Sequence, residues 1–161
     1  MTLSLVDGLH FRGVAPSGHT IDIDSRPGGE PPLAAPSPME YVLAAIGACT
    51  AMDVISILRK MRQDVTAYDV RLRSERATDH PRVFTRVEVT HCVAGNGVRE
   101  ASVRRAIQLA ITRYCPVFAM LYPGVEIAER YEIRDHASGA LVSGTVRPDD
   151  DEVTLPAAGG A

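Results

Sequence analysis

The sequence has no long run of basic residues, and its formal net charge is −3. Nucleic acid and anionic membrane surfaces are therefore not expected as partners. The N-terminus, with Asp7 and His10, lacks the basic region and the apolar run of a secretory signal. The longest strongly apolar stretch, residues 41–52, is too short to span a bilayer. These absences favour a cytoplasmic protein.

Cysteine is scarce, and its spacing is uninformative about disulfides. The three cysteines, Cys49, Cys92 and Cys115, form no C-x-x-C pair. An odd, widely spaced set argues against a secreted disulfide framework and against the usual zinc-finger ligands. The five histidines are scattered singly, without a metal-ligand partner at helical or loop spacing. We expect no metal and no cofactor, and free or catalytic thiols in a reducing compartment.

The composition is that of a single soluble globular domain. The 161 residues are 45% hydrophobic and 23% charged, which is enough for one domain with a core. Hydrophobic periodicity fades after His136, and an acidic run at residues 149–152 precedes an Ala/Gly-rich end. We therefore expect a folded domain over residues 1–136 and a mobile C-terminal tail over residues 137–161.

The elements do not alternate regularly between strand and helix. The patterns predict a hairpin, a Pro/Gly-rich loop, a long helix, two strands, an amphipathic helix, a short helix and a strand, over residues 3–24, 25–36, 37–63, 66–93, 99–114, 117–121 and 125–133. This order indicates an α+β fold with antiparallel sheet.

The long helix has the clearest start signal in the chain. Ser37 and Glu40 have the spacing of a capping box, and Pro38 suits the first helical position. Between Glu40 and Asp53 the helix has no charge on any face, so we expect it to be buried on all sides. Because a small domain cannot easily enclose such a helix, the pattern favours a dimer.

Two cysteines lie in contexts that suit chemistry as well as packing. Cys49 lies among small residues of the long helix, where a substrate or another helix can approach the sulfur. Cys115 lies just before Pro116 at an expected helix start, where backbone N–H groups lower a thiol pKa. Each is equally well explained as a packed structural thiol. Cys92 points outward from a strand and is interpreted as incidental.

The segment SPMEYVLAAIGACTAMDV, residues 37–54, resembles the central-helix signature of the OsmC/Ohr family, the osmotically inducible and organic hydroperoxide resistance proteins. Its continuation, ISILRKMRQDV, is similar to the YhfA-like branch of that family. The pieces SER, PRVFT and YCPV follow in the order that this branch shows, at residues 74–76, 81–85 and 114–117. The resemblance covers roughly residues 3–134.

The resemblance implies an intertwined homodimer, with antiparallel sheets around the long buried helices and the active sites at the subunit interface. It implies a two-cysteine thiol peroxidase for organic or hydrogen peroxides. Cys49 would attack the O–O bond and become a sulfenic acid. Cys115 would resolve it to a disulfide, which an external dithiol of lipoyl or thioredoxin type would reduce.

Two further site residues are expected from the resemblance, because family peroxidases hold the thiolate with an Arg and a Glu. Arg12 has a spacing to the following turn like that of the family Arg, and a solvated strand charge is the alternative. The family Glu position is occupied here by Met39. Glu40 follows it, with helix capping as the alternative role.

A second function is consistent with the same residues. Met39 at the usual Glu position favours a binding protein of this fold, without peroxidase activity, that holds a small apolar or thiol-reactive ligand at the dimer interface. The retained pair Cys49 and Cys115 favours the peroxidase.

Overall fold

The computed structural model describes residues 1–25 and 33–150. The chain divides into two compact units, Met1–Ala44 and Ala45–Ala161, and the long helix begins in the first and continues in the second. Each unit has its own sheet. The single domain expected over residues 1–136 is therefore built from two separately packed parts.

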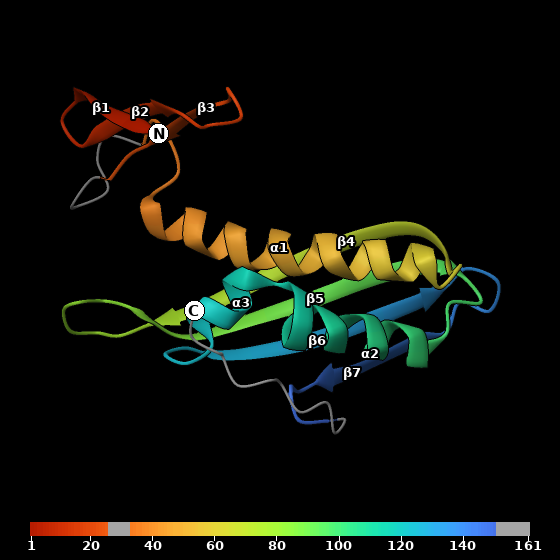
Figure 1. Ribbon diagram of the computed structural model, residues 1–161. Coiled ribbons are helices and arrows are strands. Elements are labelled where there is room, and N and C mark those ends of the chain that lie inside the picture. Colours follow the sequence, from red (N-terminus) through yellow and green to blue (C-terminus); the bar gives the residue numbers. More distant parts are fainter. Residues whose placement is uncertain (26–32, 151–161) are drawn as a thin grey trace, which may run out of the picture. The chain divides into compact units, whose positions relative to one another are not determined.

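The N-terminal unit contains a three-stranded antiparallel sheet. Its strands are β1 (Thr2–Asp7), β2 (His10–Val14) and β3 (Thr20–Ile23), in the order β1-β2-β3 (Figure 1). Gly8 makes the first turn with a φ of 54°, a left-handed conformation that costs glycine little. This turn divides the segment that was expected to form one arm of a hairpin.

Helix α1 (Pro38–Lys60) starts as its capping box predicts. The Oγ of Ser37 accepts a hydrogen bond from the backbone N–H of Glu40 at 3.4 Å. In return, Oε2 of Glu40 accepts from the backbone N–H of Ser37 at 2.7 Å and from its hydroxyl at 2.6 Å. Arg59 and Lys60 in the last turn suit the negative end of the helix dipole.

The C-terminal unit contains a four-stranded sheet in the order β4-β5-β6-β7. The strands are β4 (Asp64–Arg76), β5 (Phe84–Asn96), β6 (Glu126–Asp135) and β7 (Leu141–Val146). The β4–β5 and β6–β7 pairs are antiparallel, but β5 and β6 are parallel. The α+β class with antiparallel pairing is confirmed, and one parallel pair makes this sheet mixed. The reason is that the helices between β5 and β6 return the chain to the same end of the sheet.

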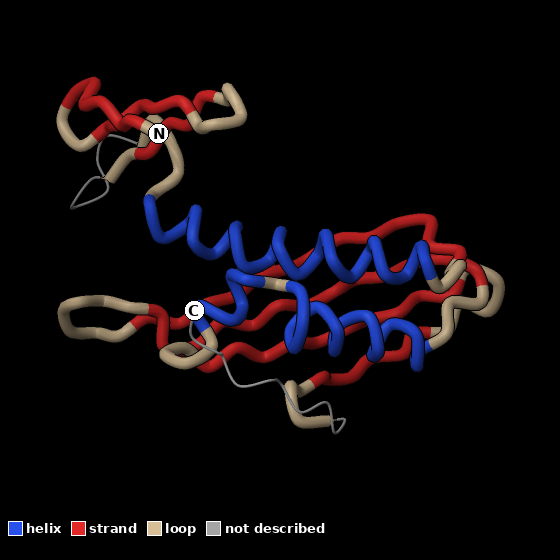
Figure 2. The backbone as a smooth tube through the Cα atoms, in the orientation of Figure 1, coloured by secondary structure: helices blue, strands red, loops and turns tan. Residues whose placement is uncertain are grey.

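Helices lie along one face of this sheet, as Figures 1 and 2 show. Helix α2 (Glu100–Leu109) runs into a single π-helical turn, η1 (Ala110–Tyr114), and α3 (Pro116–Leu121) follows. On β5 the buried face carries Val87, Val89, His91 and Val93. The unit is therefore a two-layer structure whose core lies between the sheet and the helices.

His91 of β5 is a core histidine whose two ring nitrogens both have partners. Its side chain is fully buried. Nδ1 lies 2.6 Å from the hydroxyl of Tyr68, and Nε2 lies 2.9 Å from Oε2 of Glu129.

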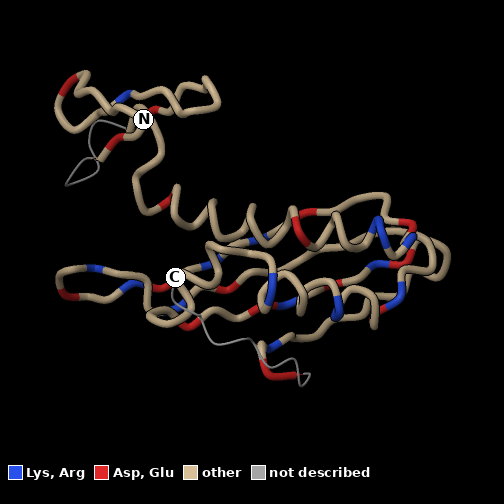
Figure 3. The backbone as a smooth tube through the Cα atoms, in the orientation of Figure 1, with Lys and Arg blue, Asp and Glu red and all other residues tan. Residues whose placement is uncertain are grey.

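Helix α1 is not buried on all sides within one chain. Ile46, Val54 and Leu58 are fully buried, whereas Met52 is 65% exposed and Ala48 is also exposed. Gly47 faces Leu72 of β4 so closely that an added Cβ would lie 2.6 Å from a Leu72 methyl carbon. The uncharged stretch between Glu40 and Asp53, visible in Figure 3, thus has one face packed on the sheet and one uncovered.

Strand β7 lies inside the segment expected to be a mobile tail, so the boundary at residue 136 is wrong. Six residues of that segment pair with β6. The carbonyl of Pro148 then accepts a hydrogen bond from Nε2 of Gln108 at 2.8 Å, and Arg104 pairs with Asp150 at 3.5 Å. Residues 151–161 of the expected tail lie outside the described residues.

By length and composition alone, the 23-residue helix α1 is long and apolar enough to cross a membrane, unlike the shorter apolar stretch identified in the sequence. Core helices of soluble proteins pass the same test. The packing of α1 against β4 is that of a core helix.

Candidate functional site

Two thiols and one carboxylate meet on the helical side of the C-terminal unit. The Sγ atoms of Cys49 and Cys115 and a carboxylate oxygen of Asp53 all lie within 4.8 Å of one another. Cys49 and Asp53 are half-buried, and Cys115 is buried with 3% exposure. The structure therefore brings together the two cysteines that the sequence singled out and adds a third group.

Local helix geometry places each of the three side chains. Cys49 and Asp53 are four residues apart in α1, so they lie on the same face, one turn from each other. Cys115 follows the π-helical turn η1 and is the N-cap residue of α3. Its backbone N–H donates to the carbonyl of Ala110 at 2.8 Å. Because π-turns interrupt regular helices frequently at functional sites, η1 adds to the case for this cluster.

The pKa of Cys115 is raised to about 12, chiefly by burial. Its hydrogen bond with Cys49 also raises the pKa, as does a negative charge on Cys49. The backbone N–H of Phe118, which donates to Sγ at 3.3 Å, lowers the pKa by less than these effects raise it. The helix start therefore does lower the pKa of Cys115 as expected, but the desolvation of the thiol raises this pKa by more.

Burial also raises the pKa of Asp53 above its ordinary value. A carboxyl group shifted in this direction retains its proton to a higher pH than an exposed aspartate, so it is better suited to exchanging protons near neutrality. The sequence argument did not identify Asp53 as a site residue. The available signal was its position one helical turn after Cys49, in a stretch otherwise without charge.

Arg12 lies on β2 of the N-terminal unit, where it forms an ion pair within that unit. Its Nε donates to Oδ1 of Asp22 at 2.8 Å, and Nε2 of His10 lies 2.8 Å from the same oxygen. Both hydrogen bonds lower the pKa of Asp22, and the one with His10 has the larger effect. Because the thiols belong to the other unit, a catalytic role for Arg12 stays a prediction.

Glu40 is engaged in the capping box, the alternative role expected for it. Its hydrogen bonds from the hydroxyl and the backbone N–H of Ser37 lower its pKa. A second role at the thiols stays a prediction.

Cys92 lies apart from the cluster, on β5 with Arg71 and Glu132 among its neighbours. Burial raises its pKa. Its thiol has a long contact of 3.8 Å with the carbonyl of Thr90. Among the described residues Cys92 forms no disulfide, and its interpretation as incidental stays a prediction.

The cluster also has the donor set of a metal site, which sequence reasoning did not expect. Two sulfurs and one carboxylate oxygen suit zinc or another thiophilic cation, with one position left for a further ligand. Metal binding would require loss of the Cys115 proton, so the raised pKa of this thiol opposes it.

The sequence of this chain is similar to those of known proteins. A family model described as OsmC-like protein matches residues 28–130. Protein YhfA of Escherichia coli K12 is 45% identical over 128 residues, which cover 80% of this chain and 92% of that protein. The residues that the family model matches include Cys49, Asp53 and Cys115.

Solved structures show the same fold. A hypothetical protein from Aquifex aeolicus is 27% identical, with a TM-score of 0.74, over 84% of this chain and 95% of that one. The organic hydroperoxide resistance protein OhrB of Bacillus subtilis is 13% identical, with a TM-score of 0.57, over 81% of this chain and 96% of that one. At this identity the second likeness concerns the fold alone.

Proposed function

Because this chain belongs to the OsmC/Ohr family, we propose that it is a two-cysteine thiol peroxidase that reduces organic hydroperoxides or hydrogen peroxide. One observation carries the proposal: the sulfurs of Cys49 and Cys115 lie within 4.8 Å of each other and of an Asp53 oxygen. A modest approach of the two sulfurs would form a disulfide, whose S–S bond is about 2.05 Å long.

The raised pKa of Cys115 supports a reaction order in which Cys49 attacks the peroxide first and Cys115 reacts second. With a pKa of about 12, only about one Cys115 thiol in 10⁵ is ionised at pH 7. Peroxide reduction needs a thiolate, so Cys49 is the better first nucleophile. Its thiolate attacks one peroxide oxygen and the O–O bond breaks. Cys49 becomes a sulfenic acid, and the alkoxide takes a proton to leave as an alcohol.

Resolution requires Cys115 to lose its proton as its sulfur attacks the Cys49 sulfenic acid. The S–O bond breaks, a disulfide forms, and the departing hydroxide takes a proton to become water. Asp53 is the carboxyl group beside both sulfurs. We assign it the transfer of the Cys115 proton to the leaving oxygen. Its raised pKa brings its own proton exchange closer to neutrality.

The remaining partners follow from this chemistry. An external dithiol of lipoyl or thioredoxin type returns the disulfide to two thiols and is itself oxidised, in a reducing cytoplasmic setting. The uncovered face of α1 around Ala48 and Met52 supports a homodimer, because a second chain would remove this apolar surface from water. Arg12 and Glu40 stay the proposed supporting residues.

Mass spectrometry after treatment with cumene hydroperoxide in the presence of dimedone tests the assignment. In Cys115→Ser we expect a dimedone adduct on Cys49, because the sulfenic acid has no resolving thiol. In Cys49→Ser we expect little adduct on Cys115. The wild type should lose two thiols per chain, and Cys92→Ser should behave like the wild type.

An adduct mainly on Cys115 would reverse the roles of the two thiols. No adduct on either cysteine, with no loss of thiols in the wild type, would refute the peroxidase. That result would favour the alternative function, binding of a small apolar or thiol-reactive ligand at the dimer interface, which Met39 at the usual Glu position also favours.

A further inference from the structure

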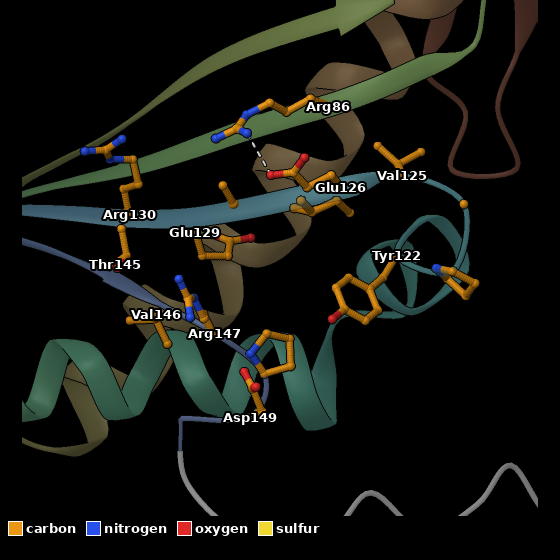
Figure 4. Close-up of a pocket in the computed structure, with 15 residues that line it drawn as sticks. Arg86, Tyr122, Val125, Glu126, Glu129, Arg130, Thr145, Val146, Arg147 and Asp149 are labelled. Atoms are coloured by element: carbon orange, nitrogen blue, oxygen red, sulfur yellow. Dashed lines mark hydrogen bonds and ion pairs between the residues drawn. The ribbon is translucent and has the colours of Figure 1, made fainter.

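A cavity of about 670 Å³ lies in the C-terminal unit, where β6 begins and β7 ends. Its wall includes Tyr122, Ile127, Glu129, Val146 and Pro148, and none of the three thiol-cluster residues lines it. Figure 4 shows the side chains of Tyr122, Glu129 and Val146, which come from the end of α3, from β6 and from β7. The volume is that of a small-molecule site.

One polar group in this wall has an unused hydrogen-bonding atom. Glu129 is 1% exposed, and its Oε2 lies 2.9 Å from Nε2 of His91. Its Oε1 is buried and has no hydrogen-bond partner within residues 1–25 and 33–150. Because a buried acceptor without a donor is costly, this oxygen is suited to receive a donor from a ligand in the cavity.

The second oxygen of Glu129 is held by a buried chain of hydrogen bonds. Burial raises the pKa of Tyr68, so its hydroxyl keeps its proton and can donate it to Nδ1 of His91 when that nitrogen is unprotonated. The proton on Nε2 is then directed to Glu129. This tautomer would satisfy the hydrogen bonds of His91 with a neutral imidazole, and His91 would then orient the carboxylate without cancelling its charge.

Three arginines line the cavity, and among the described residues two of them, Arg86 and Arg130 but not Arg147, are paired with other carboxylates. Arg86 contacts Glu126 at 2.7 Å, and Arg130 contacts Glu88 at 3.1 Å. Neither forms an ion pair with Glu129 among the described contacts. Among the described residues the ion-pair partner of Glu129 is His91, which offsets the carboxylate charge only when it is protonated, so beside a neutral His91 the carboxylate favours a positively charged ligand group.

We propose that this cavity binds a small organic cation, a protonated amine with an apolar body. The ammonium N–H donates to Oε1 of Glu129. The apolar body packs against Tyr122, Ile127 and Val146. This site is independent of the thiol chemistry, since its residues belong to β6, β7 and the end of α3.

The full-length protein, labelled with ¹⁵N, would be titrated with 2-phenylethylamine and with 2-phenylethanol, a neutral molecule of nearly the same shape. We expect saturable shifts at residues 127–130 and 146–149, and binding of the amine about tenfold or more tighter than that of the alcohol. Equal affinity for the two compounds, shifts elsewhere or no saturable binding would overturn the proposal.

Glu129→Gln keeps the shape of the side chain and removes its charge, so it should lose most of the preference for the amine. Glu132→Gln is the matched control, because Glu132 lies on the same strand, does not line the cavity and is paired with Arg71. It should bind the amine like the wild type. An unchanged preference in Glu129→Gln would contradict the assignment. If Glu129→Gln does not fold, the comparison of amine and alcohol affinities for the wild type still tests the proposal.

Discussion

The carboxylate of Asp53 and the thiol of Cys115 lie within 4.8 Å of each other, although they come from different helices. Burial raises the pKa of both groups, so each keeps its proton to a higher pH than an exposed group of its kind. This relationship connects the site to a kinetic step, because the resolving thiol must give up its proton before a disulfide forms.

Replacing Asp53 should therefore slow resolution more than the first attack on peroxide. In Asp53→Asn we expect disulfide formation to slow by about tenfold or more, because the proton acceptor is lost. The rate of sulfenic acid formation, followed by dimedone trapping, should change less. Asp69→Asn, an exposed aspartate on β4, is the control. Equal slowing of both steps would show that Asp53 only shapes the surroundings of the two thiols.

Stability should fall at alkaline pH in a way that depends on Cys115. Its folded-state pKa of about 12 lies above the ordinary thiol value of about 8.5. The folded state then holds a proton that the unfolded state releases, so stability is complete below about pH 8.5 and decreases as pH rises toward 12. Urea unfolding at several pH values should show a smaller decrease in Cys115→Ser. Tyr68, whose pKa is also raised, contributes equally in both proteins.

A charge on the uncovered face of α1 should dissociate the expected dimer. Sedimentation velocity of the wild type should give a dimer at micromolar concentration, and Ala48→Glu should shift it to monomer, because burying an unpaired charge is costly. Ala101→Glu, the same change on the exposed side of α2, should leave the dimer intact. A folded wild-type monomer at micromolar concentration would refute the dimer.

The C-terminal segment after β7 should contribute to stability, in contrast to the mobile tail expected from sequence. Ending the chain after Val146 removes the carbonyl of Pro148 that Gln108 contacts, at a cost of about 1–3 kcal/mol. Ending it after Asp150 keeps this contact. Thermal unfolding should therefore show a lower midpoint for the shorter chain, and equal midpoints would mean that the contact adds nothing.

Local sequence determined the features that depend on neighbouring residues. Ser37, Pro38 and Glu40 set the start of α1, because capping involves atoms within one turn. The pattern over residues 66–93 predicted two strands, which the structure has as β4 and β5. The motifs around Cys49 and Cys115 identified the family, which the match over residues 28–130 confirms.

Only the tertiary structure decided the features that depend on distant segments. β7 was missed because Leu141–Val146 gains its stability from pairing with β6, which its own residues do not encode strongly. The pKa of Cys115 was expected to be lowered because helix starts are visible in sequence, whereas the burial that outweighs this effect depends on how the helices pack. Asp53 became a site residue only when α3 brought Cys115 beside it, since a carboxylate on one helix acquires its chemistry from the groups that folding places around it.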